Sequence, residues 1–439
     1  MEKTEAFTNE FEEMADAEKK KQKMSKLAKV IIIILSIVIL FLSIIIILMA
    51  IKKKDKKENS STNNDGNENN KEGEYDSEAI TNFLRKIFLG EVFYNLTYAT
   101  EKVENTFKIN GKNYREEIGP VNDNEDYISN NYNIYDLYIP YSANKTKKSK
   151  GIILFIHGGA WIQGSKEEMT YLCQIYFEHE YIIANLDYTL LSEEVNNTNI
   201  YRQLDDISAC INDIKSRLVK MGFNETELEI ALGGGSAGAH LSLLYGYLVK
   251  EPPLPVRFIM DAIGPVNLET DDFYVIEKDE DTLPDIEPNT VNEALKKKTY
   301  NKPLFNETYI IRLMNLFIGN KYSRKEQQEI FKDNKIDKEN PKYKELYEKS
   351  KYGSPLYWMK DKDIPILAHY GGKDLLIGFV QYARLRETAD KYNNTLQLVY
   401  SRYGGHGLSE YEHPEGIIAA KDFHFYMLKF CDDYFTKFK

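Results

Sequence analysis

The segment LEIALGGGSAGAHL, residues 228–241, decides the fold class. Its first five residues form the short apolar run of a buried strand, and its last residues begin a leucine-rich helix. Between them, Gly234 to Gly238 match the pattern G-x-S-x-G, in which glycines leave room for a serine in a strained turn from strand to helix. This strand–turn–helix setting favours Ser236 as a nucleophile over a plain Gly/Ser loop.

Predicted strands and helices alternate on both sides of Ser236. Short apolar runs predict buried strands at residues 150–156, 181–186, 258–263, 365–370 and 396–400. Apolar residues three and four positions apart predict an amphipathic helix over 201–221, and another helix is expected over 379–392. This alternation predicts an α/β protein with a mostly parallel, doubly wound sheet.

The loop after the strand at 150–156 carries a second candidate feature. It reads His157-Gly158-Gly159-Ala160-Trp161. Two successive glycines allow backbone N–H groups to face outward without a side chain in the way, as an oxyanion hole requires. A tight turn between strand and loop would explain the same glycines.

A serine nucleophile also needs a general base and a carboxylate that orients the base. His406 is the candidate base among the seven histidines, because it lies between glycines in a loop after the strand at 396–400. Asp374 is the candidate carboxylate, because it ends the strand at 365–370. Capping of the following helix is the alternative role for Asp374.

Four other polar residues near these motifs have structural interpretations. His240, four residues after Ser236, is interpreted as a packing residue, and His369 as a hydrogen-bonded core histidine. Asp205 and Asp206 fall in the predicted helix over 201–221 and are expected to be surface or capping charges.

The order and approximate spacing of these motifs resemble those of the hormone-sensitive-lipase-like esterases of the α/β-hydrolase fold, over about residues 132–439. The segments 157–161 and 236–240 are most similar to the branch that contains prenylcysteine methylesterase, kynurenine formamidase, and acetyl and feruloyl esterases. The resemblance implies an α/β-hydrolase fold with a helical cap inserted at about residues 270–352. One departure is Tyr370, where such enzymes often have histidine.

The same resemblance implies a role for each of six residues. Ser236 would be the nucleophile, His406 the general base and acid, and Asp374 the orienting carboxylate. The backbone N–H groups of Gly158, Gly159 and Ala237 would form the oxyanion hole.

Composition excludes several other classes of function. The chain has 57 Lys and Arg against 68 Asp and Glu, a formal charge of −11, so it lacks the basic surface of a nucleic-acid-binding protein. Three cysteines are too few for a disulfide framework or a cysteine zinc site. No other residues have the spacing of metal ligands, and we expect neither a metal nor a cofactor.

The N-terminal part of the chain predicts a membrane anchor. Residues 30–51 contain no charge and, as a helix, would reach about 33 Å, enough to cross a bilayer. They predict a single-pass transmembrane helix, preceded by a short polar tail over 1–29. A flexible polar linker over 52–76 then leads to a catalytic domain over 77–439.

The orientation of this anchor depends on potential glycosylation sites, because lysines flank both of its ends in nearly equal number. Seven Asn-x-Ser/Thr sequons follow it, and none precedes it; they begin at Asn59, Asn95, Asn144, Asn196, Asn224, Asn306 and Asn393. This distribution predicts a glycoprotein with a cytoplasmic N-terminus and an exoplasmic catalytic domain.

Together these features predict a membrane-anchored serine hydrolase that cleaves small-molecule carboxylic esters through an acyl-enzyme. Two alternatives remain open: an adhesion or interaction ectodomain that keeps the fold without catalysis, and a serine hydrolase directed at amides or peptides. The sequence does not indicate an oligomeric state.

Overall fold

The computed structural model of the chain describes residues 90–98, 108–109, 112–113, 133–192, 198–268, 274–275, 302–303, 307–319, 321–372, 374, 376–401, 404–407 and 414–436. The chain divides into two compact units, Met1–Asp76 and Ser77–Lys439, and all described residues belong to the second. The predicted tail, transmembrane helix and linker lie outside the described residues. Among the residues described, no helix combines the length and apolar character needed to cross a membrane.

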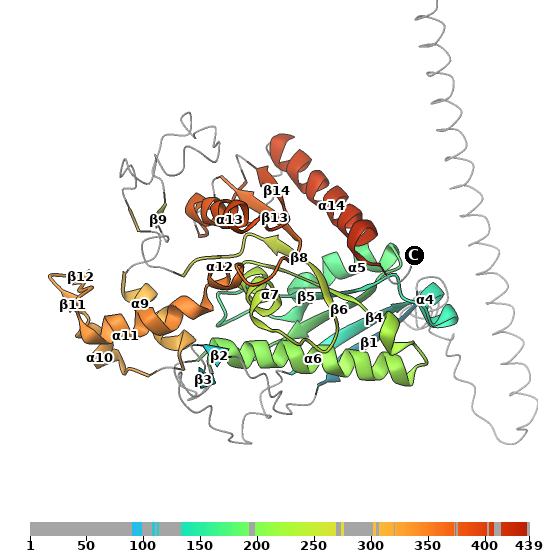
Figure 1. The fold of residues 1–439 in the computed structure, drawn as a ribbon, viewed down its shortest axis with the longest axis horizontal. Coiled ribbons are helices and arrows are strands. Elements are labelled where there is room, and N and C mark those ends of the chain that lie inside the picture. Colours follow the sequence, from blue (N-terminus) through green and yellow to red (C-terminus); the bar gives the residue numbers. More distant parts are fainter. Residues whose placement is uncertain are drawn as a thin grey trace, which may run out of the picture. The chain divides into compact units, whose positions relative to one another are not determined.

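An eight-stranded sheet runs through the second unit (Figure 1). Its strand order is β1-β4-β6-β5-β7-β8-β13-β14. Strand β4 pairs antiparallel with β1 and β6, and the strands from β6 onward in this order are parallel. The predicted α/β-hydrolase fold with a mostly parallel sheet is therefore confirmed. The strands are β1 Gly90–Thr97, β4 Ile134–Pro140, β5 Ile152–Ile156, β6 Ile182–Asp187, β7 Ile230–Gly235, β8 Val256–Ala262, β13 Ile366–Gly371 and β14 Leu396–Ser401.

Helices cover both faces of this sheet (Figure 1). Strand β5 is fully buried, and its residues alternate between two apolar clusters. Ile153 and Phe155 pack with α5 (Thr170–Glu178) and α14 (Pro414–Tyr434) on one face. On the opposite face, Leu154 packs in a cluster that includes residues of three further helices: α6 Ile200–Lys220, α7 Ala237–Leu248 and α13 Phe379–Tyr392.

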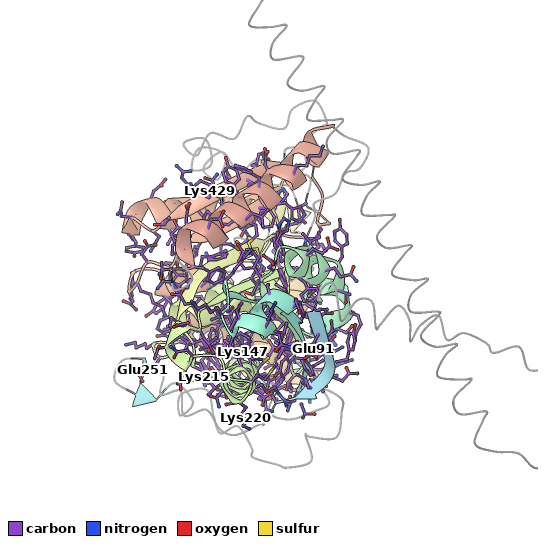
Figure 2. The ribbon with its side chains drawn as sticks, turned by 90° about the vertical axis from the view of Figure 1, so that its right-hand side faces the viewer. Glu91, Lys147, Lys215, Lys220, Glu251 and Lys429 are labelled. Atoms are coloured by element: carbon purple, nitrogen blue, oxygen red, sulfur yellow. The ribbon has the colours of Figure 1, made fainter. Side chains whose placement is uncertain are left out.

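Helix α6 follows directly from its sequence pattern and lies within one residue of the predicted helix. The Asn199 side chain accepts hydrogen bonds from the N–H groups of Tyr201 and Arg202 and so caps the first turn. One face buries the apolar residues Leu204, Ile207, Ile211, Ile214 and Leu218. Lys215 and Lys220 belong to the other face and point outward (Figure 2).

A helical insertion separates β8 from β13 in the chain. It contains α9 Glu307–Phe317, α10 Arg324–Gln328, the hairpin β11–β12 (Phe331–Lys332 and Lys335–Ile336), α11 Pro341–Ser350 and the 3-10 helix η6 Lys351–Gly353. We call these elements the cap. Helix α12 (Pro355–Trp358) follows them and leads to β13. The predicted cap bounds of about 270–352 stay a prediction, because residues 276–301 lie outside the described residues.

Other short elements complete the described part of the chain. They are α4 Tyr141–Thr146, the 3-10 helices η2 Lys166–Met169 and η3 Glu225–Glu227, and two pairs of two-residue strands, β2–β3 (Lys108–Ile109 and Lys112–Asn113) and β9–β10 (Tyr274–Val275 and Lys302–Pro303). The three cysteines are free and buried.

The strand before Ser236 differs from its predicted bounds of 228–232. Strand β7 begins at Ile230 and continues through Gly235, because its three glycines still pair with β8. A Cβ on Gly234 would stand 2.4 Å from the carbonyl oxygen of Ile156 in β5. Gly234 is glycine because there is no space for a side chain. A search for runs of apolar side chains therefore ends the strand too early.

The expectation that Asp206 is a surface or capping charge is wrong. Its side chain is buried, accepts a hydrogen bond from the Thr189 N–H at 2.8 Å and binds Arg202 Nε at 3.0 Å. Asp206 thereby ties α6 to the chain that follows β6. Helical periodicity could not show this, because the partner N–H comes from another element.

Candidate active site

Ser236 lies in the sharp turn between β7 and α7, with φ 52° and ψ −117°. This conformation is strained for a residue with a side chain and persists only where its surroundings impose it. The Ser236 N–H donates to the carbonyl of Ala262 at 2.8 Å, and its own carbonyl accepts from the His240 N–H at 3.0 Å. These bonds tie the turn to β8 on one side and to α7 on the other.

The two glycines that flank Ser236 in the G-x-S-x-G pattern permit the turn. A Cβ on Gly238 would stand 2.0 Å from the carbonyl oxygen of Ile156 and 2.5 Å from that of His157. A Cβ on Gly234 would meet Ile156 and Gly238 in the same way. The first turn of α7 therefore packs directly against the end of β5, with no space for side chains.

Asp374 and His406, which are 32 residues apart, form a hydrogen-bonded pair. His406 Nδ1 lies 2.9 Å from Asp374 Oδ2. The Asp374 side chain is buried, and its other oxygen accepts from the N–H groups of Leu376 and Ile377 at 2.7 and 2.9 Å. Asp374 therefore shapes the turn before α13 and orients His406 at the same time. The two roles considered from the sequence do not exclude each other.

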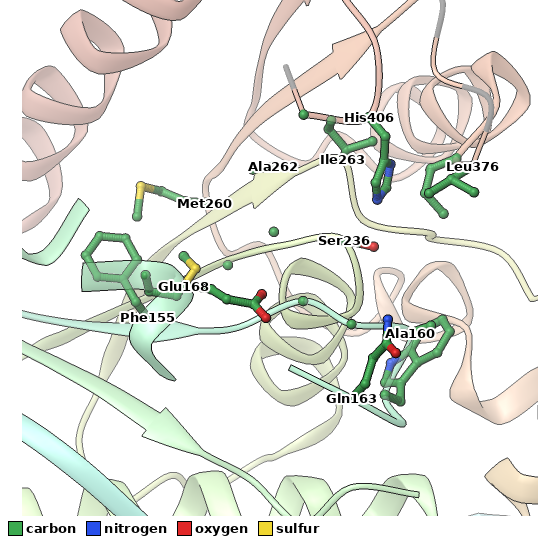
Figure 3. A pocket seen from close by; sticks show the side chains of 18 of the residues that line it. Phe155, Ala160, Gln163, Glu168, Ser236, Met260, Ala262, Ile263, Leu376 and His406 are labelled. Atoms are coloured by element: carbon green, nitrogen blue, oxygen red, sulfur yellow. The ribbon is translucent and has the colours of Figure 1, made fainter. Parts of the chain in front are cut away.

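Ser236 and His406 line one cavity of about 570 Å³ at the carboxyl ends of β5, β7 and β8. In Figure 3 the imidazole of His406 points toward Ser236. With Nδ1 bound to Asp374, Nε2 is the nitrogen that faces the serine. A base oriented toward the serine in this way is one requirement for proton transfer from its hydroxyl.

The loop after β5 forms another wall of the cavity. Gly158 lies against the turn: a Cβ there would stand 3.5 Å from Ser236 Cβ. Gly159 has φ +97°, and a Cβ on it would stand 2.0 Å from the carbonyl of Gln163. Ala237 is the first residue of α7, so its N–H has no partner within the helix. The N–H groups of Gly158, Gly159 and Ala237 are thus carried by segments that border the same space.

Apolar side chains line most of the remaining cavity wall. They come from β5, β8, the start of α5, α9 of the cap and α14; examples are Phe155, Met260, Leu172, Leu313 and Phe423. Glu168 is the acidic side chain of the lining and points into the cavity (Figure 3). The lining residues that the structure describes include no lysine or arginine.

Sequence reasoning missed the role of Tyr188, whose side chain holds the glycine loop through hydrogen bonds and ring stacking. Its hydroxyl is 3.0 Å from the carbonyl oxygen of Gly158 and 3.2 Å from that of His157. Its ring stacks on the His157 ring at 4.2 Å. Burial lowers the pKa of His157 to about 4, so this imidazole is neutral near pH 7. The position of Tyr188 directly after a buried strand was the available signal.

Sequence reasoning also missed a buried pair behind Ser236, formed by Asp261 of β8 and Tyr370 of β13. The Tyr370 hydroxyl lies 2.7 Å from Asp261 Oδ2 and 2.6 Å from the carbonyl oxygen of Gly264, and the Gly264 N–H donates to Asp261 Oδ1 at 2.6 Å. Burial raises the pKa of Asp261 to about 7. A protonated Asp261 donating to Tyr370, which donates to Gly264, satisfies every group.

His369 is a buried core histidine, as expected, but one of its nitrogens does not have the expected partner. Burial lowers its pKa to about 4. Its ring packs against Phe423, and within the described part of the chain its Nε2 atom has no hydrogen-bond partner.

Among the residues that the structure describes, no cluster of three or more His, Cys, Asp or Glu side chains could hold a metal ion.

Comparison with known families identifies the group to which this arrangement belongs. The BD-FAE family profile matches residues 135–388, more than half of the chain, from β4 through most of α13. The chain belongs to the BD-FAE family. BD-FAE proteins form an esterase and hydrolase family, and the matched range contains Ser236 and Asp374. His406 lies beyond its end.

A plant relative of this BD-FAE chain matches a shorter segment. The Arabidopsis thaliana protein named "Probable isoprenylcysteine alpha-carbonyl methylesterase ICMEL2" is 32% identical over 121 residues. These residues make up 27% of this chain and 26% of the plant protein, so the match spans about a quarter of that relative.

Solved structures of esterases are similar at low sequence identity. Esterase B from Lactobacillus rhamnosis is 15% identical, with a TM-score of 0.45 over 81% of this chain and 90% of the other. A truncated carbohydrate esterase from gut microbiota is 15% identical, with a TM-score of 0.46 over 77% and 98%. Thermogutta terrifontis esterase 2 is 14% identical, with a TM-score of 0.43 over 69% and 91%.

Proposed function

We propose that this BD-FAE protein is a membrane-anchored serine hydrolase that cleaves carboxylic esters through an acyl-enzyme on Ser236. The pairing of His406 with Asp374, at the wall of the cavity that Ser236 lines, is the observation that carries the proposal. A hydroxyl needs an oriented base to act as a nucleophile near neutral pH. Membership of an esterase family supports the same reaction class.

In the proposed first step, Ser236 Oγ attacks the carbonyl carbon of the ester while His406 Nε2 takes the Oγ proton. The carbonyl π electrons move to oxygen, and the N–H groups of Gly158, Gly159 and Ala237 donate to the resulting oxyanion. As the bond to the leaving alcohol breaks, His406 returns the proton to the alcohol oxygen. The products of this step are a free alcohol and an acyl group on Ser236.

In the second step, water replaces the alcohol. The water oxygen attacks the acyl carbon while His406 Nε2 accepts a proton from the water. The N–H groups of Gly158, Gly159 and Ala237 again donate to the oxyanion. Collapse of this intermediate returns the proton to Ser236 Oγ and releases the carboxylic acid. The cycle requires no oxidant, reductant or metal.

The membrane anchor is part of the proposal and rests on the sequence. The uncharged residues 30–51 would hold the catalytic domain at a bilayer surface through the linker over 52–76. The sequons beyond this segment support an exoplasmic catalytic domain. The apolar cavity wall favours esters of small uncharged acyl, alkyl or aryl groups.

Labelling with a fluorophosphonate probe tests the reaction class directly. Full-length protein in mild detergent is treated with the probe, and the adduct is located by peptide mass spectrometry. We expect one adduct on Ser236, and Ser236→Ala should lose both the adduct and ester hydrolysis without a change in melting temperature. Folded protein that neither reacts nor hydrolyses aryl esters would favour the adhesion role. Faster cleavage of an aryl amide than of the matching ester would favour the amide-directed alternative.

A further inference from the structure

One imidazole connects the glycine loop, the nucleophile helix and the cap. The indole N–H of Trp161, the last residue of the loop, donates to Nδ1 of His240 at 3.1 Å, and the two rings meet edge to face with centroids 5.1 Å apart. The other nitrogen of His240, Nε2, lies 2.8 Å from the carbonyl oxygen of Gly353 at the end of the cap. His240 is fully buried.

These partners determine which nitrogen of His240 carries the proton. An indole N–H only donates and a backbone carbonyl only accepts, so Nδ1 must accept from Trp161 and Nε2 must donate to Gly353. Burial lowers the pKa of His240 to about 4, and the ring is therefore neutral near pH 7. An apolar residue at this position would leave two buried polar groups unpaired.

The glycine loop needs such a connection because it is strained. Ala160 and Trp161 have φ values of 49° and 64°, a left-handed conformation that is unfavourable for a residue with a side chain. The Trp161 carbonyl accepts from the Leu191 N–H at 2.9 Å and from Gln203 at 3.1 Å. Its indole supplies a side-chain connection to the helix that begins after Ser236.

His240 is also close to the nucleophile along the chain and touches the cap. It lies one helical turn after Ser236, to whose carbonyl its N–H donates. Phe317, the last residue of α9, packs edge to face against Trp161 at 4.8 Å and parallel to the His240 ring at 6.2 Å. The glycine loop, the serine turn and the cap therefore share one buried aromatic junction.

We propose that His240 is a positioning residue that sets the spacing between the oxyanion N–H groups and Ser236 through Trp161, and ties the cap to that spacing through Gly353. This inference rests on the proposed esterase function. The spacing matters because misplacing a reacting group by about 1 Å can cost 100-fold in rate.

Conservative variants can separate the two connections. In His240→Asn, the amide oxygen can take the place of Nδ1 and accept from Trp161, but the side chain is too short to reach Gly353. In His240→Gln, the amide nitrogen takes the place of Nε2 and can donate to Gly353, and the acceptor for Trp161 is lost. Trp161→Phe removes the same bond from the other partner.

Trp358→Phe is the matched control. Trp358 is the other tryptophan of the chain; its side chain is also buried, and its indole N–H also donates one bond, to the carbonyl of Tyr352 at 2.8 Å. It does not line the cavity. The control therefore removes one buried indole hydrogen bond and leaves the bond between Trp161 and His240 in place.

Steady-state kinetics on an aryl ester with the full-length protein in detergent provide the test. We expect Trp161→Phe and His240→Gln to lower kcat by about 10- to 100-fold with KM within about threefold. His240→Asn should keep kcat within about threefold and raise KM, because only the cap is released. Trp358→Phe should lower the melting temperature and leave kcat unchanged, because the bond between Trp161 and His240 stays in place.

The inference is wrong if Trp161→Phe and His240→Gln keep kcat within twofold of the Trp358→Phe control. His240 would then be only a packing residue. A wild-type protein that hydrolyses esters and labels on Ser236 would keep the proposed function intact in that case. A wild-type protein that does neither would overturn the proposed function itself.

A measurement on the wild-type protein covers the case in which the Trp161 and His240 variants do not fold. Because the chain has two tryptophans, 5-fluorotryptophan labelling yields two ¹⁹F resonances, which Trp358→Phe assigns. Reaction of Ser236 with a phosphonate places a P–O group among the oxyanion N–H groups. We expect the Trp161 resonance to shift while that of Trp358 does not. An unchanged Trp161 resonance in fully phosphonylated protein would contradict the inference.

Discussion

At the scale of single residues, the Asp374 carboxylate has a different partner set on each oxygen. One oxygen binds His406, and the other accepts two backbone N–H groups of the turn before α13. An asparagine could keep the turn through its oxygen while its NH₂ group opposes His406 Nδ1. The geometry would survive, and the imidazole would be held in the wrong tautomer.

We therefore predict that Asp374→Asn lowers kcat by roughly 10⁴ with little change in KM. Ester hydrolysis and thermal melts should be measured on the same preparation. A lower melting temperature with unchanged kcat would mean that Asp374 only caps the turn and that another group orients His406.

Asp261 yields a prediction about stability and pH. Burial raises its pKa to about 7 in the folded protein, against about 3.9 in an unfolded chain. Folding therefore favours the protonated carboxyl group. Its contribution to stability is complete below pH 4 and is lost as pH rises toward 7, by up to about 1.4 kcal/mol per pH unit.

Asp261→Asn should remove this loss, because the amide can donate to Tyr370 and accept from Gly264 as the protonated acid does. The free energy of unfolding of the variant should exceed that of the wild type increasingly between pH 5 and pH 8. Urea unfolding at three pH values in this range measures the difference. A difference that is constant with pH would show that Asp261 does not gain a proton on folding.

At the scale of elements, the close approach of β5, β7 and α7 depends on glycine. A Cβ at residue 238 would stand 2.0 Å from the backbone of Ile156, which has no freedom to move inside the sheet. Gly405, in the loop before His406, has no atom within 4 Å of the corresponding position. The two glycines therefore differ in the space available to a methyl group.

We predict that Gly238→Ala lowers the free energy of unfolding by about 3 kcal/mol or more, whereas Gly405→Ala lowers it by less than about 1 kcal/mol. Chemical unfolding and the soluble yield of both variants check this. Similar values for the two would show that α7 can move away from β5.

At the scale of the whole molecule, charge should select among substrates. The chain carries a formal charge of −11, and the cavity lining contains Glu168. Both disfavour an approaching carboxylate, and the cavity wall has apolar rather than basic side chains to receive it.

We predict that kcat/KM for 4-nitrophenyl butyrate exceeds that for 4-nitrophenyl hemisuccinate by at least about tenfold. Glu168→Gln should narrow this ratio, whereas Glu167→Gln should not, because the Glu167 carboxylate pairs with Lys166 at 2.6 Å and does not line the cavity. Equal ratios in all three proteins would exclude Glu168 as a source of the selectivity.

Topology is the other property of the whole chain that can be tested. If residues 1–29 are cytoplasmic and the catalytic domain is exoplasmic, as we propose, a eukaryotic host should add glycans first at Asn59, in the predicted linker, or at Asn95, which is exposed on β1. Endoglycosidase treatment would reveal them as a mobility shift. Membrane-bound protein without such a shift, whose catalytic domain is digested by protease outside sealed vesicles, would have the opposite orientation.

Features that depend on residues near one another along the chain could be predicted from the amino-acid sequence. The apolar runs of β5 and β6, the periodicity of α6 and the glycines around Ser236 each express a local requirement of backbone geometry or of one buried face. They were sufficient to predict an α/β protein with a mostly parallel sheet and to select Ser236. The predicted end of β7 was wrong because the strand continues through glycines to Gly235, and at Gly234 lack of space and not apolar character determines the residue type.

The tertiary structure shows how distant groups meet, including Asp374 and His406, which the sequence had proposed as partners. Strand order places β13 beside β8 and β14 beside β13, so the loops carrying Asp374 and His406 reach each other and open on the cavity that Ser236 lines. The same packing buries Asp206, pairs Asp261 with Tyr370, and joins His240 to Trp161. Periodicity shows which face of an element is buried but not which element covers it, and that partner is set by the order and register of the strands.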